Sequence, residues 1–170
     1  RNYEVDLAVM GRPPSEFDVE SKAIGKHPQV IICAPDHPLA RERNIPIEAL
    51  MGETFLVREA NSGTRNSFAQ LMSQHDGGRD VREFEMGSNE TIKQAVMAGL
   101  GISFISSHTV AAEVEAGRLV IMDVVGLPLI KTWHVVRRTD KRLLPSAEAM
   151  YRFWVEHGGD YLPKITGHAD

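Results

Sequence analysis

Two short polar loops carry the residues best suited to chemistry. The first, Ser62-Gly63-Thr64-Arg65, follows the apolar run 55–57 and precedes a segment with helical spacing. Its two hydroxyls, its close-approaching glycine backbone and its guanidinium together suit a carboxylate or a phosphate. The same four residues would also make a capped helix start with the arginine in solvent. Both interpretations stay open at this point.

The second loop is Ser88-Asn89-Glu90, which follows the expected strand 81–86 and opens the expected helix 90–98. Ser88 or Asn89 can cap that helix, and a cap is the favoured role from the residues alone. Glu90 suits the helix dipole but would repel an anion placed directly against it. In both loops a strand's carboxyl end meets a helix N-terminus, which is where open α/β sheets bind ligands.

A third candidate is Arg12, in the turn after the expected strand 5–10. It could point into a cleft from another lobe, although a solvated turn arginine is equally consistent with its position. The predicted ligand-binding residues are therefore those of the first loop (Ser62, Gly63, Thr64 and Arg65), Asn89 and Arg12.

Catalysis, metals and cofactors find little support in the sequence. The seven histidines show no paired helical spacing and no cysteine or carboxylate cluster beside them. The single cysteine, Cys33, lies in an apolar run and should be a small buried hydrophobe. There is no Gly-x-Ser-x-Gly motif, and Gly99-Leu100-Gly101 lacks the third glycine of a dinucleotide loop, so it is expected to end a helix. We predict no catalytic residue, no metal and no cofactor.

Composition limits the partners and the compartment. The 170 residues are 42% hydrophobic and 25% charged, with a net charge of -4, and no basic stripe could neutralise a run of phosphates. Direct DNA binding by this segment is therefore not expected. No apolar run approaches the ~20 residues of a membrane helix, and one lone cysteine suits the reducing cytoplasm. Because the chain lacks an initial Met and starts almost at once with a strand, we expect a fragment of a longer protein.

Short apolar runs alternate with helical segments, the pattern of an α/β fold with a largely parallel sheet. The expected strands are 5–10, 17–24, 29–35, 54–58, 81–86, 102–106, 118–123 and 131–138. The expected helices are 46–51, 64–75, 90–98, 108–116 and 145–157. Two extended segments, 26–35 and 126–138, could cross between lobes. Residues 1–29 with 131–170 would then form a first lobe, and residues 30–130 a second.

At this level of detail the chain resembles the LysR-type transcription regulators over nearly its whole length. The resemblance is carried by residues 4–11, by Ala34-Pro35-Asp36-His37-Pro38-Leu39-Ala40, by the loop 61–65, and above all by 87–102, which end in Ala-Gly-Leu-Gly-Ile. Residues 10–14 and 126–138 resemble the subgroup that controls carbon-dioxide-fixation operons.

The resemblance implies a type 2 periplasmic-binding-protein-like fold, in which two α/β lobes joined by crossing strands hold a small anionic effector between them. It maps Ser62, Thr64, Arg65 and Asn89 onto the effector-contacting part of the second lobe. The implied effectors are phosphorylated sugars, phosphoenolpyruvate or NADPH. It also implies dimers or tetramers, and an N-terminal winged helix-turn-helix that binds DNA. That domain and the start of the first lobe are absent here, so the first lobe is expected to be truncated.

Two other functions fit a similar fold. A prephenate dehydratase also uses a Thr-Arg pair near a helix start, as Thr64-Arg65 could be, but no further matching signature is present. A secreted solute-binding protein is the second alternative, and a signal peptide in the parent gene would identify it. We expect a regulator's sensing domain that catalyses no reaction.

Overall fold

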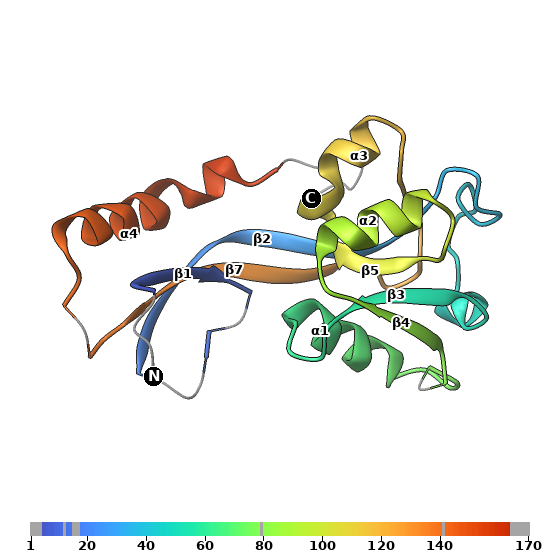
Figure 1. Cartoon of the computed structure of the whole chain (residues 1–170), viewed down its shortest axis with the longest axis horizontal. Helices are drawn as coiled ribbons and strands as arrows, with labels where there is room; N and C mark the ends of the chain where they lie inside the picture. Colours follow the sequence, from blue (N-terminus) through green and yellow to red (C-terminus); the bar gives the residue numbers. More distant parts are fainter. Residues whose placement is uncertain (1–4, 12, 15–17, 79, 141, 164–170) are drawn as a thin grey trace. The chain divides into compact units, whose positions relative to one another are not determined.

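The computed structural model describes residues 5–11, 13–14, 18–78, 80–140 and 142–163 (Figure 1). The chain divides into two compact units. Among the described residues, the first unit comprises those up to His27 together with those from Ile130 onward, and the second spans Pro28–Leu129.

The second unit is a layered α/β structure entered by the long strand β2 (Val19–Cys33). Its further elements, in sequence order, are η1 (Ile47–Leu50), β3 (Thr54–Arg58), α1 (Gly63–Met72), β4 (Arg82–Met86), α2 (Asn89–Met97), β5 (Ser103–Ser106), η2 (Ser107–Val110), α3 (Ala111–Glu115) and β6 (Val120–Ile121). The strands β2, β5 and β6 belong to a five-stranded sheet, and β3 pairs with β4 and contacts the chain before β5 through the bridge Phe55–Ile102. Successive strand residues point to opposite faces, so these strands have two apolar faces to cover. Helices α1 and α2 lie on opposite sides of these strands (Figure 1).

Each face of these strands packs against one helix. On the α1 side the ring of Phe68 lies 4.8 Å from that of Phe55 and 6.0 Å from that of Phe104. On the α2 side Ile92 and Val96 are fully buried in a cluster with apolar residues of β2, β3 and β5. The two helices are therefore fixed on the strands by packing, and their N-termini are fixed with them.

The first unit is smaller. Its strand β1 (Leu7–Met10) pairs antiparallel with β7 (Leu129–Arg138), and β7 in turn neighbours β2. The unit ends with α4 (Pro145–His157) and η3 (Gly158–Tyr161). The Arg137 guanidinium lies 4.6 Å from the centre of the buried Tyr151 ring. Its nitrogens also bond Glu20 and Glu148, which ties β7 to β2 and α4.

The expectation of a largely parallel sheet was wrong. The strand pairs β1–β7, β2–β5 and β2–β6 are antiparallel, whereas β3–β4 and the bridge Phe55–Ile102 are parallel. Strands joined by α1 and α2 run in one direction, as helical crossovers require. The strand β2 enters from the other unit and runs against them, a direction that the alternation of strands and helices does not reveal.

A second correction concerns β2, which was expected as two strands, 17–24 and 29–35. It is one strand of 15 residues. The ladder stays continuous because β2 changes partners: β7 adjoins it in the first unit, and β5 and β6 pair with its second half. A proline is tolerated in a strand where the neighbour does not need its N–H.

The glycines after α2 have two different roles. Gly99 has a φ of 75°, so it ends the helix as expected. A Cβ on Gly101 would lie 2.3 Å from the carbonyl oxygen of Thr54. Glycine at this second position therefore lets the chain entering β5 approach β3 closely. This contact places β5 beside β3.

Candidate functional site

The carboxyl ends of three strands meet at one edge of the second unit. The parallel register between β3 and β4 runs from Thr54↔Arg82 to Arg58↔Met86, and β5 is parallel to β3 through the bridge Phe55–Ile102. Because the chain passes from β3 to α1 and from β4 to α2, both helices begin at this edge. The structure thus brings the two predicted loops, 62–65 and 88–90, to the same edge.

The N-terminus of α1 is open. Ser62 is its N-cap residue in extended conformation, yet within the described residues its side chain makes no capping hydrogen bond. The first turn contains no acidic residue. A Cβ built on Gly63 would meet no described atom within 4 Å, so packing does not require glycine there. The free N–H groups and the positive end of the helix dipole therefore remain available to an anion.

Thr64 and Arg65 follow in the same turn, and both are half-buried. The Arg65 guanidinium forms an ion pair with Glu83 of β4 through Nη2. Its Nη1 is buried and has no hydrogen-bond partner in the part of the chain that the structure describes. The carboxylate of Glu83 thus neutralises the charge of Arg65 and links α1 to β4.

Helix α2 begins differently. Its cap is Ser88, whose Oγ accepts a hydrogen bond of 3.0 Å from the Thr91 N–H. Asn89 is therefore free for another role, and its Oδ1 accepts a hydrogen bond of 2.8 Å from Nη1 of Arg58. This bond connects the end of β3 to the first residue of α2.

Arg58 is a residue that the sequence reasoning missed. Its Nε and Nη2 donate to the two carboxylate oxygens of Glu59, at 2.7 and 2.8 Å. The hydrogen bond from Arg58 holds the pKa of Glu59 below its ordinary value. The available signal was its place as the last residue of an apolar strand, directly before the polar loop.

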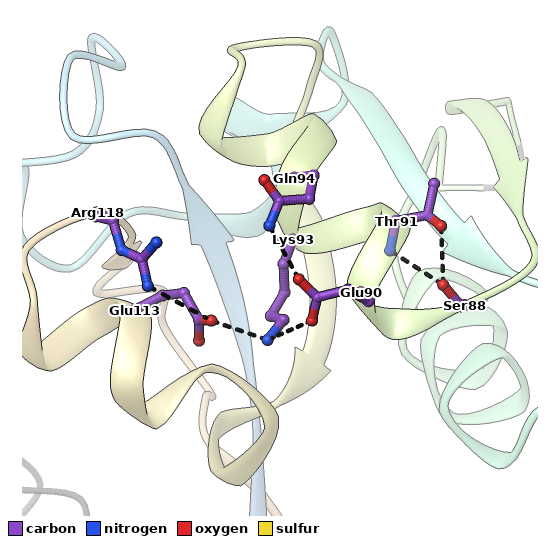
Figure 2. A network of polar contacts seen from close by, with 7 residues as sticks. All are labelled: Ser88, Glu90, Thr91, Lys93, Gln94, Glu113 and Arg118. Atoms are coloured by element: carbon purple, nitrogen blue, oxygen red, sulfur yellow. Dashed lines mark hydrogen bonds and ion pairs between the residues drawn. The ribbon is translucent and has the colours of Figure 1, made fainter.

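Behind this edge an ionic network holds α2 to α3 (Figure 2). The ammonium of Lys93 lies 2.8 Å from Glu90 and 2.9 Å from Glu113, and Arg118 lies 3.9 Å from the same Glu113 oxygen. The pKa of Glu90 is lowered, chiefly by its hydrogen bond from Lys93. Glu90 in the first turn of α2 is thus paired with a cation, which weakens the repulsion it would exert on an anion.

The remaining predicted residue, Arg12, is outside the described residues. Within the described ranges no three histidines, cysteines or carboxylates are arranged to hold a metal ion. No described helix is long and apolar enough to cross a membrane. Cys33 is fully buried, as expected.

The first unit contains a surface hollow of about 720 Å³. It is lined by Arg137, Arg138, Arg142, Glu148 and neighbouring residues. Two of its three arginines already have carboxylate partners: Arg137 pairs with Glu20 and Glu148, and Arg138 pairs with Asp140. We take the strand edge of the second unit as the candidate site because both predicted loops lie there.

Comparison with known proteins identifies the family. The model of the LysR substrate binding domain matches residues 1–159. The chain belongs to this family. Its fold is the type 2 periplasmic-binding-protein-like fold of LysR regulatory domains, as expected.

The relatives by sequence are transcription regulators, not enzymes. The chain is 46% identical to the HTH-type transcriptional regulator CbbR of Xanthobacter flavus over 98% of its length and 50% of that protein. It is 45% identical to a RuBisCO operon transcriptional regulator of Allochromatium vinosum over 88% of its length and 49% of that protein. The chain thus spans about half the length of these relatives. The predicted resemblance to regulators of carbon-dioxide-fixation operons is confirmed, and the enzyme and solute-binding alternatives are not favoured.

A solved structure extends the comparison. The regulatory domain of CcmR from Synechocystis PCC6803, in complex with 2-PG, is 35% identical to this chain and has a TM-score of 0.79. The match covers 90% of this chain and 73% of that one.

Proposed function

We propose that this domain senses a small phosphorylated or carboxylated anion and binds it at the strand edge of the second unit. The observation that carries the proposal is the first turn of α1, which has neither a side-chain cap among the described residues nor an acidic residue. A helix N-terminus left open in this way attracts an anion through its N–H groups. Asn89 lies at the start of the second helix on the same edge.

The comparisons support an anion of this kind. CcmR, the related regulator, was solved with 2-PG, a phosphorylated acid. We extend the same ligand class to this chain, which includes sugar phosphates and phosphoenolpyruvate. NADPH belongs to the class as well, through its phosphates.

The wider role follows from the relatives. We propose that the effector changes how a LysR-type regulator assembles as dimers or tetramers, and so how it acts on an operon for carbon dioxide fixation in the cytoplasm. DNA contact would be made by a helix-turn-helix outside this segment, because the matched regulators are HTH-type and about twice as long. The net charge of -4 supports this division of roles, because it does not favour binding to phosphates along DNA.

Calorimetric titration tests the site. Gly63→Asp places a carboxylate at the open end of α1, where a Cβ has room and where an acidic residue suits the helix dipole. It should therefore fold well and weaken the binding of 2-PG, ribulose bisphosphate, phosphoenolpyruvate or NADPH by about tenfold or more. The matched control is Gln70→Glu, which adds the same charge on an exposed part of the same helix.

The site is supported if an anion binds saturably, if Gly63→Asp weakens this binding, and if Gln70→Glu changes the dissociation constant by less than about twofold. If none of the four anions binds, the ligand class is wrong. If an anion binds equally well to both variants, the site lies elsewhere.

A further inference from the structure

Arg58 presents an oriented guanidinium at the carboxyl end of β3, the strand that leads into α1. All three guanidinium nitrogens are engaged: two donate to Glu59 and the third donates to Asn89, over distances of 2.7–2.8 Å. The side chain is only 23% exposed. Because one bond crosses to the first residue of α2, the guanidinium is held in one orientation at the carboxyl edge of β3.

The partner of this guanidinium is a partly exposed carboxylate on the loop after β3. The Glu59 carboxylate accepts two parallel N–H bonds, the arrangement in which arginine also binds a phosphate or a ligand carboxylate. Its side chain is 42% exposed, and Glu59 follows directly after the last residue of β3. Turning this side chain into water would therefore disturb no buried packing.

Arg65 is placed differently. Its partner Glu83 pairs in register with Phe55, the second pair of the parallel β3–β4 ladder, so this ion pair connects α1 to the body of β4. The side chains of Glu83 and Glu59 are 31% and 42% exposed, so the two ion pairs differ in the position of the carboxylate more than in its exposure. The contact fits a support between helix and strand better than a ligand at the edge.

We propose that Arg58 is the cation that binds the effector. The Glu59 carboxylate accepts the two parallel N–H bonds of this guanidinium, its fork, until an anionic effector displaces it. This inference rests on the proposed function and deepens it by naming the residue and its internal competitor. The effector group is a carboxylate or a phosphate monoester with two oxygens free to accept parallel hydrogen bonds. Asn89 keeps the Arg58 guanidinium in place during the exchange.

The test uses two matched pairs of variants, with 2-PG and inorganic phosphate as calorimetric probes. Arg58→Lys and Arg65→Lys both keep the charge and remove the fork. We expect the first to weaken binding about tenfold or more and the second by less than about threefold. Glu59→Gln and Glu83→Gln both remove one negative charge. We expect the first to tighten binding about two- to fivefold and the second to change it by less than about twofold.

The outcomes separate this inference from the function on which it rests. If the unmodified chain binds 2-PG but Arg65→Lys is the damaging change and Glu59→Gln has no effect, the inference is overturned while the anion-sensing function stands. If no variant binds either anion, both fail. If Arg58→Lys does not fold, Glu59→Gln decides, because the Glu59 side chain is 42% exposed and its replacement should not prevent folding. Binding that is tighter in Glu59→Gln than in Glu83→Gln supports the exchange. Unchanged binding in Glu59→Gln overturns it.

Discussion

Replacing Lys93 with methionine tests whether the ionic network between α2 and α3 stabilises the second unit. The side chains of Lys93 and Glu113 are 12% and 10% exposed, and their charged atoms lie 2.9 Å apart. Oε2 of Glu113 is buried and has no hydrogen-bond partner in the described chain. Without the ammonium, the buried carboxylate would keep only Arg118, which is 3.9 Å away and 57% exposed.

The cost follows from this partial burial. Removing one partner of a fully buried pair costs about 3–5 kcal/mol, whereas exposed pairs contribute less than about 1 kcal/mol. Lys93→Met should therefore reduce the free energy of unfolding by about 2 kcal/mol. The double variant Lys93→Met with Glu113→Leu should cost less than about 1 kcal/mol, because it leaves no buried charge unpaired.

Urea unfolding at neutral pH measures these free energies, and the probe must report on the correct unit. Both tryptophans, Trp133 and Trp154, belong to the first unit, so their fluorescence follows that unit. Hydrogen exchange of residues 89–97 follows the second unit, whereas far-UV circular dichroism would also include α4 of the first unit. A loss below about 0.5 kcal/mol for Lys93→Met, or a double variant as unstable as the single one, would refute the reasoning.

The pH dependence of the free energy of unfolding checks the direction of these effects. The hydrogen bond from Lys93 lowers the pKa of Glu113, so this stabilisation is present above the carboxyl's unfolded pKa and is lost as the pH falls through the folded one. Hydrogen bonds from the lysine, first to Glu90 and then to Glu113, raise the pKa of Lys93, so its share is lost only as the pH rises through that raised value. The difference between the unmodified chain and Lys93→Met should therefore persist near neutrality and shrink in acid below about pH 4 and in strong alkali.

Two further predictions concern single side chains. Ser88→Ala should destabilise the chain by about 1 kcal/mol because it removes a formed helix cap. Ser62→Ala should cost clearly less, because that side chain caps nothing among the described residues. Urea unfolding compares the two variants. Burial raises the pKa of the Cys33 thiol to about 11, so a thiol reagent at pH 8 should label it only after unfolding; rapid labelling of the folded chain would contradict its burial.

Much of the fold could be predicted because local signals agreed with the packing. The strand 54–58 and the helix 145–157 have the expected bounds, α2 is capped by Ser88, one of the two predicted caps, and Gly99 ends it as predicted. The single long β2 was missed because its continuity depends on a change of partner strand. That exchange is a tertiary property with no local signature.

The candidate site shows the same limit. Arg58 and Arg65 stand at the two ends of one polar loop, and local composition favoured Arg65 because its neighbours include a helix-capping motif. Their environments are decided by the register of β4, which places Glu83 against α1 and the start of α2 beside the end of β3. One arginine thereby pairs with a strand carboxylate, and the other with an exposed loop carboxylate and Asn89. The two arginines are almost equally buried, at 23% and 22% exposed, so the partner distinguishes them: displacing Glu59 moves a loop side chain, whereas displacing Glu83 opens the contact between α1 and β4.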